Sequence, residues 1–135
     1  MYLNKVWDLP YETERRLAAL GYRKVAVEDK QVFEPFYDRM NDDWSSPMSF
    51  MAMIAWENTL PFYYKITGDY LALLGWDALE NRMTMLPLIG HYADAPLQKA
   101  FATARQDHVT LGYPLCVMDM REWMRVFYDR IPDAR

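Results

Sequence analysis

The chain has 135 residues, of which 52% are apolar and 25% are charged, and its formal net charge is −4. This size predicts one domain with a substantial core. The acidic balance argues against a nucleic-acid partner, because nucleic-acid binding needs a basic face. The longest nearly apolar run, residues 48–56, is too short to cross a membrane, so we expect no transmembrane segment. A single cysteine and the lack of a continuous apolar N-terminal run predict a cytoplasmic protein.

The first part of the chain predicts a helix, a strand and a second helix. Residues 12–20 form the first helix, which Gly21 ends because a residue without Cβ suits the left-handed cap. Residues 23–27 alternate with period two and predict the first strand. Asp29 is the expected N-cap of the second helix. We expect Pro35 to kink or restart that helix, because an interior proline removes a hydrogen bond.

A buried helix and an antiparallel meander are predicted next. Ser46 before Pro47 is a strong helix start. Residues 48–56 are apolar almost all round, so we expect this helix to be buried between layers. Three strands then follow, at residues 63–67, 70–75 and 82–89. Gly68–Asp69 marks the tight turn between the first two strands, and Pro87 places the end of the third at a sheet edge or a bulge.

The C-terminal part predicts a helix, a short strand and a last helix. Residues 94–111 form an amphipathic helix, and the continuous apolar run at 115–118 is typical of a central strand covered on both faces. Residues 120–131 carry one apolar stripe. The complete order predicts an α+β fold in one domain over residues 1–135, with residues 1–22 as a helical extension. We expect a mixed sheet with a central antiparallel meander and helices on both faces.

Residue groups in these elements also carry a family resemblance. They are Glu28, Asp29, Lys30 and Phe33; Ser49, Phe50 and Trp56; Tyr64, Ile66, Asp69, Tyr70 and Leu71; Pro87, Gly90 and Leu97; and Cys116, Val117, Arg121, Glu122 and Trp123. The chain resembles the first half of a bacterial family that shares the phosphatidylglycerol lysyltransferase C-terminal domain. Members look like two GNAT-type acyltransferase halves in tandem, and the predicted order of elements is that of the GNAT-type fold. The resemblance covers residues 25–131.

The same resemblance also bears on catalysis. It covers only about half of the family's usual length, and it implies that acyl or aminoacyl transfer takes place mainly in the second half or between the halves. No active-site residue is therefore carried over onto this chain. The resemblance also implies a pyrophosphate site for acyl-CoA with the signature Q/R-x-x-G-x-G/A, which this sequence lacks.

The nearest substitute for that signature is the turn at residues 90–94, where free backbone N–H groups at a helix start could hold an anion. Asp94 and the lack of a nearby Lys or Arg argue against an anion there. We therefore expect no cofactor, with acyl-CoA as the alternative.

Three residues are candidates for acid–base chemistry. His91 follows a strand and precedes a helix, and histidine is the commonest general base near neutral pH. Asp119 closes the last predicted strand, where ligands gather in α/β sheets, and Glu122 lies just beyond it. The alternative for Asp119 is a cap on the final helix. His108 lies on an apolar helix stripe and is interpreted as a half-buried, satisfied residue.

Three aromatic residues are candidates for ligand contact, namely Tyr64, Tyr70 and Trp76. The alternative is plain packing, because aromatic pairs across a hairpin usually stabilise the sheet itself. No His, Cys, Asp and Glu spacing indicates a metal site, so we expect none.

Two functions remain open. The first is a non-catalytic GNAT-like half-domain that forms a homodimer or binds a partner or a small-molecule ligand, since a lone half would leave apolar surface or a sheet edge uncovered. The alternative is an acyl- or aminoacyltransferase that moves an acyl group from a thioester or a charged tRNA to an amine. A small-ligand sensor lined by the hairpin aromatics is a third interpretation.

Overall fold

A computed structural model describes residues 9–40, 49–56, 60–114, 117 and 122–131 of the chain. The elements in order are α2 (Tyr11–Leu20), β1 (Arg23–Lys24), the 3-10 turn η1 (Val27–Asp29), α3 (Lys30–Asp38), α4 (Phe50–Trp56), β2 (Phe62–Thr67), β3 (Tyr70–Asp77), β4 (Arg82–Ile89), α5 (Asp94–Thr110) and α6 (Glu122–Asp129). The mixed helix and strand content confirms the α+β class.

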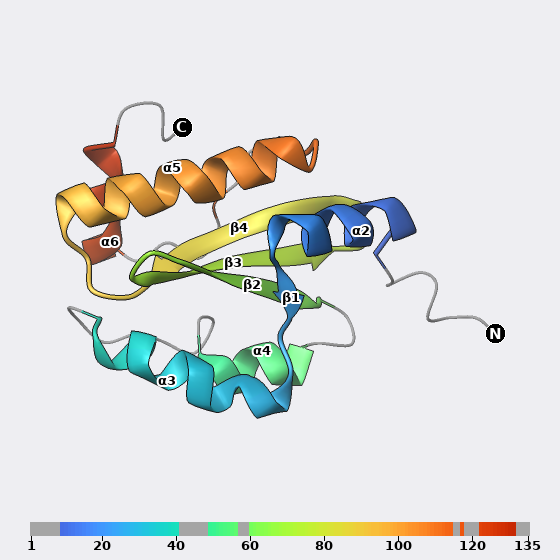
Figure 1. The fold of residues 1–135 in the computed structure, drawn as a ribbon, viewed down its shortest axis with the longest axis horizontal. Coiled ribbons are helices and arrows are strands. Elements are labelled where there is room, and N and C mark those ends of the chain that lie inside the picture. The colour runs from blue at the N-terminus through green and yellow to red at the C-terminus, as the bar shows by residue number, and fades with distance from the viewer. Residues whose placement is uncertain (1–8, 41–48, 57–59, 115–116, 118–121, 132–135) are drawn as a thin grey trace.

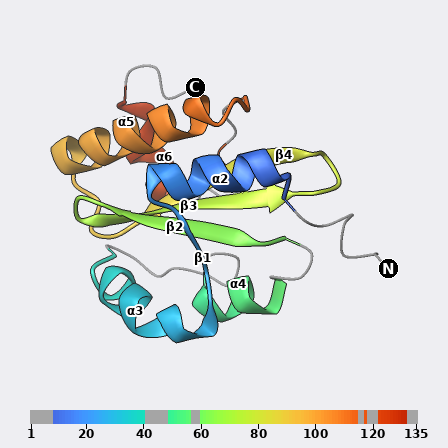
Figure 2. The same ribbon diagram turned by 45° about the vertical axis from the view of Figure 1, so that its right-hand side comes forward.

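The sheet forms the middle layer of the molecule, with helices on both faces (Figures 1 and 2). Its four strands lie in the order β1-β2-β3-β4, and every neighbouring pair is antiparallel. α3 and α4 cover one face, whereas α2, α5 and α6 lie on the other side (Figure 1). The predicted meander and the helices on both faces are thus confirmed.

The parallel part of the expected mixed sheet is seen only as one isolated bridge, between Met85 of β4 and Val117. The rest of the segment at 115–118, which was expected to be a central strand, lies outside the described residues. Val117 lies beside β4 and therefore extends the order beyond the four strands of the antiparallel sheet.

The hairpin between β2 and β3 follows the sequence prediction closely. Thr67 pairs with Tyr70 across the two-residue turn, and Gly68 in that turn has a φ of 59°. Such a left-handed conformation costs glycine little and other residues more. The prediction of a tight turn at Gly68–Asp69 is therefore confirmed.

The pairing of β3 with β4 contains a bulge at the predicted proline. Leu71 pairs with Ile89 and Leu73 pairs with Leu86, so two residues of β4 lie opposite one residue of β3. Pro87 is one of these two and has no backbone N–H to donate. The prediction that Pro87 marks an edge or a bulge is confirmed.

The alternation along β2 decides which side chains meet which helices. Tyr64 points to the α3 side, where its ring lies 5.0 Å from the ring of Phe33. The next residue, Lys65, points to the other side and forms an ion pair with Asp107 of α5. Side chains at alternate positions therefore build two separate packed layers, one on each face of the sheet.

β1 is shorter than predicted. It ends at Lys24 instead of residue 27, because the following backbone turns into η1. The Asp29 carboxylate accepts a hydrogen bond of 2.8 Å from the Ala26 N–H, which holds this turn. Asp29 precedes α3 as expected, but its side chain caps no N–H of α3. α3 continues through Pro35 as one helix, so the restart is not seen, and the kink at Pro35 stays a prediction.

α4 differs from its prediction in burial. Met51 is 62% exposed and Trp56 is 58% exposed, so this helix is not buried all round, and only Phe50 and Met53 are fully inside. The Ser49 hydroxyl accepts a hydrogen bond of 3.1 Å from the Ala52 N–H and caps the helix. The expected start at residues 46–47 lies outside the described residues.

Across the described residues, no helix has the length and apolar character that crossing a membrane requires.

Candidate functional site

A cavity of about 340 Å³ lies at the junction of four segments. We call it the Arg39 cavity, and it is lined by Arg39, Asp69, Tyr70, His91, Ala93 and Pro96. Arg39 directly follows α3, Asp69 and Tyr70 come from the β2–β3 hairpin, and the others lie between β4 and the first turn of α5. Residues far apart in sequence thus meet at one end of the sheet.

The wall between the hairpin and the β4–α5 connection is fixed by two contacts. The Tyr70 hydroxyl donates a hydrogen bond of 2.6 Å to the His91 carbonyl. Gly90 lies so close to the hairpin that a Cβ there would come within 2.7 Å of the Asp69 carbonyl oxygen and 2.9 Å of the Tyr70 ring. Only glycine permits this approach. The backbone beside Asp69 and His91 is therefore held in one arrangement.

The cavity brings together charges of both signs. Within the described part of the chain, neither the Arg39 guanidinium nor the Asp69 carboxylate forms an ion pair. Arg39 lies over the ring of Phe36, with 5.2 Å between the guanidinium carbon and the ring centroid. The Asp69 charge reaches Tyr70, where it adds to the effect of burial and raises the pKa of the hydroxyl. Two residues of opposite charge, which form no ion pair with each other, thus line the same hollow.

The sequence argued against an anion beside α5 because of Asp94 and because no Lys or Arg is near it in the sequence. The structure supplies a cationic residue for each of these two objections. Asp94 pairs with Arg130, with 3.1 Å between the Arg130 Nε and the carboxylate. The cation that the local sequence lacks comes from Arg39, more than fifty positions upstream of this helix. The cavity therefore has the cationic residue that residues 90–94 lack, and Asp69 adds one anionic residue to the same lining.

The structure places the sequence candidates at different sites. Tyr70 and His91 border the Arg39 cavity. Tyr64 lies on the other face of the sheet, where its hydroxyl donates a hydrogen bond of 2.9 Å to Asp29. Trp76 packs against Tyr113, with 5.7 Å between the ring centroids. The three candidate aromatic residues therefore do not line one common pocket.

The two acidic candidates are described incompletely. Asp119 lies outside the described residues, and Glu122 is the first residue of α6, with its side chain outside them. The residues that the sequence did not single out are Arg39 and Asp69. Asp69 was noted only as part of the turn and among the residues that carry the family resemblance, and no local pattern distinguished Arg39 from a solvated arginine.

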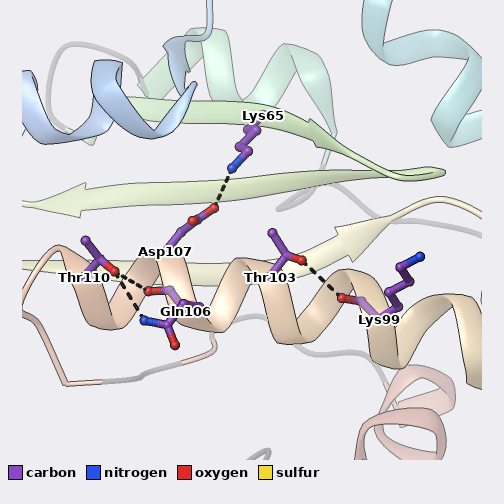
Figure 3. Close-up of polar contacts among 6 residues, drawn as sticks. All are labelled: Lys65, Lys99, Thr103, Gln106, Asp107 and Thr110. Atoms are coloured by element: carbon purple, nitrogen blue, oxygen red, sulfur yellow. Dashed lines mark hydrogen bonds and ion pairs between the residues drawn. The ribbon is translucent and has the colours of Figure 1, made fainter.

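A second polar cluster links α5 to the sheet. The Lys65 ammonium points toward the Asp107 carboxylate of α5 (Figure 3). These two groups lie 2.9 Å apart, and their side chains are 24% and 10% exposed. Lys65 also lies over the ring of Tyr22 at 5.6 Å. Burial is the main cause that raises the pKa of the Tyr22 hydroxyl, and the Asp107 charge adds to it. The cluster connects β2 to α5, and none of its residues lines the Arg39 cavity.

His108 is fully buried, not half-buried as expected. Its Nε2 lies 3.0 Å from the Pro114 carbonyl, which can only accept, so Nε2 carries the proton. The other ring nitrogen, Nδ1, is buried without a hydrogen-bond partner. Burial lowers the pKa of His108, and the Pro114 carbonyl partly opposes this. The residue is structural.

Within the described residues, no group of three His, Cys, Asp or Glu side chains is arranged to hold a metal ion. Comparisons of the chain with protein families, with curated proteins and with solved structures give no match.

Proposed function

We propose that this chain is a GNAT-like half-domain whose role is to bind a small ligand in the Arg39 cavity, and that it acts without catalysing a transfer. The observation that carries the proposal is Arg39, which lines a preformed hollow and whose guanidinium has no ion-pair partner among the described residues. A volume of about 340 Å³ lies at the lower end of the range for ligand sites, roughly 300–1,000 Å³.

The surroundings of His91 support binding over catalysis. A catalytic histidine is normally oriented by a hydrogen bond to its second ring nitrogen. In the described part of the chain, His91 contributes its carbonyl to Tyr70, but no hydrogen bond of its imidazole is present. His108 has its Nε2 committed to Pro114.

Small anions test the binding role directly. Sodium acetate titrated into ¹⁵N-labelled protein is expected to shift the backbone amide signals of His91 and Ala93, which border the cavity. Arg39→Gln is expected to abolish these shifts, whereas Arg16→Gln, an exposed arginine of α2, leaves them unchanged. Equal responses of the wild type and Arg39→Gln would reject the proposal.

The second candidate function is the acyltransferase. His91 lies in the connection that leads into α5, where the backbone N–H groups of the first turn and Arg39 could hold a phosphate. A ligand at 100 times its dissociation constant stabilises a protein by about 2.7 kcal/mol. A saturable rise in melting temperature with CoA and acetyl-CoA, lost in Arg39→Gln, would favour the enzyme. No rise supports the non-catalytic role.

We also propose that the chain forms a homodimer, and that α4 lies in the interface. Met51 and Trp56 expose large apolar side chains on this short helix. The free edge of the sheet is a poorer site, because β1 exposes Arg23 and Lys24 there and like charges oppose strand addition.

Light scattering tests the homodimer. Met51→Lys is expected to give a monomer. Leu79→Lys is the control, because Leu79 is 80% exposed in the turn between β3 and β4. This variant adds the same charge and is expected to leave the dimer intact. A wild-type monomer at every concentration would refute the proposal.

A further inference from the structure

We propose that the Arg39 cavity is selective for a small zwitterion that carries a carboxylate at one end and a primary ammonium at the other. The inference rests on the proposed ligand-binding role of this cavity and adds the chemical class of the ligand. It is carried by Asp69, which lines the same cavity as Arg39.

The two charged residues are suited to the two ends of such a molecule. The Arg39 guanidinium is a planar fork of N–H donors that matches a carboxylate. The Asp69 carboxylate only accepts hydrogen bonds, and an ammonium group only donates them. A purely anionic ligand would meet repulsion from Asp69, and a purely cationic ligand would meet repulsion from Arg39. A zwitterion satisfies both residues.

The separation of the two charges leaves room for a ligand. Arg39 and Asp69 border one cavity, yet they form no ion pair with each other, so their charged atoms lie beyond ion-pair distance. Ala93, Pro96 and Tyr70 line the same space, whose surface is mainly apolar and offers contact to a short carbon chain. The molecule expected here therefore carries its two charges at opposite ends of a carbon chain.

The Asp69 side of the cavity is built to keep its position. Gly90 packs directly on the Asp69 carbonyl and the Tyr70 ring, and the Tyr70 hydroxyl holds the His91 carbonyl at 2.6 Å. A rigid site loses less conformational entropy when a ligand binds. Asp69 itself follows Gly68 in the turn, a position where asparagine is as well tolerated as aspartate.

A matched set of three probes tests the inference in the full chain. The probes are 4-aminobutanoate, butanoate and n-butylamine, which share a four-carbon chain and differ only in their charged ends. Isothermal titration calorimetry or ¹⁵N amide shifts would measure the dissociation constants. We expect 4-aminobutanoate to bind at least about tenfold more tightly than either single-charge probe, because each end adds one charge-assisted hydrogen bond.

The variants assign each end of the probe to a residue. Asp69→Asn is expected to weaken 4-aminobutanoate about tenfold while leaving butanoate unchanged or tighter. Arg39→Gln is expected to abolish binding of both. Arg16→Gln and Asp129→Asn, which remove exposed charges elsewhere, are the matched controls.

The outcomes separate this inference from the proposed function. If butanoate binds as tightly as 4-aminobutanoate and both depend on Arg39, the cavity binds ligands but is not selective for zwitterions, and only this inference is overturned. If Asp69→Asn does not weaken 4-aminobutanoate, the inference is overturned as well. If no probe binds and acetate also has no effect at Arg39, the inference and the proposed function both fail.

Discussion

The hydroxyl groups of Tyr92 and Tyr128 lie 2.9 Å apart and together satisfy both backbone polar groups of Leu88. The Leu88 N–H donates to Tyr128 at 2.8 Å, and Tyr92 donates to the Leu88 carbonyl at 2.7 Å. Since Tyr92 uses its proton there, Tyr128 must donate to Tyr92. The bulge beside Pro87 removes Leu88 from the regular ladder, and these two side chains replace the missing bonds.

This relationship predicts that Tyr128→Phe destabilises the protein strongly for so small a change. It leaves the buried Leu88 N–H without an acceptor, which costs about 1–3 kcal/mol. Tyr92→Phe is expected to cost less, because a carbonyl tolerates incomplete satisfaction better than an N–H. Urea unfolding measures both variants, with the exposed Tyr11→Phe as the control. Equal stability of Tyr128→Phe and the wild type would contradict this assignment.

Gly90→Ala is expected to lower stability and to disturb the Arg39 cavity. The new Cβ would meet the Asp69 carbonyl oxygen at 2.7 Å, and backbone cannot move aside as a flexible side chain can. Overpacking of this kind costs about 1–3 kcal/mol. Gly68→Ala is the control, because it also has a positive φ but nothing within 4 Å of its Cβ. Thermal unfolding should show a larger loss for Gly90→Ala. The reverse order would show that the close approach is not needed.

The buried His108 is expected to make the folded protein less stable in mild acid. Its pKa is lowered by burial in the folded protein, whereas the unfolded chain has the ordinary value of about 6.5. Below that pH the unfolded state binds more protons, so its free energy falls relative to the folded state. The contribution of His108 is thus fully present above about pH 6.5 and is lost as the pH falls toward the folded pKa.

The difference between the wild type and His108→Gln isolates this effect from the carboxylates. The glutamine amide can still donate to the Pro114 carbonyl but does not titrate. Urea unfolding at pH 7.5 and pH 5.0 is expected to show the wild type losing stability relative to the variant. The slope is at most about 1.4 kcal/mol per pH unit. A constant difference across this range would exclude a lowered pKa.

The meander could be predicted because its signals are local. The turn at Gly68–Asp69 and the strands predicted on both sides of it give β2 and β3, and the strand predicted at 82–89 has the bounds of β4. The end of β1 could not be predicted in this way. It depends on the Asp29 side chain, which takes the Ala26 N–H and turns the backbone into η1.

The Arg39 cavity could be predicted only in part, because it is a product of the tertiary fold. His91 and Tyr70 attracted interest from their positions in the sequence, and both border the cavity. Arg39 comes from the end of a helix on the opposite side of the sheet from α5, and no spacing in the sequence relates it to His91 (Figure 1). Its role depends on how α3 packs.

Removing either partner of the ion pair between Lys65 and Asp107 is expected to lower the stability of the protein, and the two losses should differ. Lys65→Met leaves the Asp107 carboxylate, only 10% exposed, without its counter-ion. Asp107→Asn leaves Lys65 charged, but this longer side chain is 24% exposed and can reach water. Lys65→Met should therefore lower the free energy of unfolding more than Asp107→Asn.

A double-mutant cycle on this pair should give a coupling energy of about 0.5–3 kcal/mol. The exposed pair of Arg15 and Glu12 is the comparison, and its coupling should be smaller because solvent screens it. Similar coupling energies for the two pairs would show that α5 is not held to β2 by this contact.

Tyr64 is expected to stabilise the fold and not to bind ligand. Its hydroxyl donates to one carboxylate oxygen of Asp29, while the other oxygen accepts the Ala26 N–H. Tyr64→Phe should lower stability by about 1 kcal/mol. It should leave acetate binding unchanged, because Tyr64 lies on the opposite face from Tyr70 of the Arg39 cavity. Amide shifts measured with acetate on Tyr64→Phe and Arg39→Gln make the comparison. Weaker acetate binding by Tyr64→Phe would show that Tyr64 contributes to the ligand site.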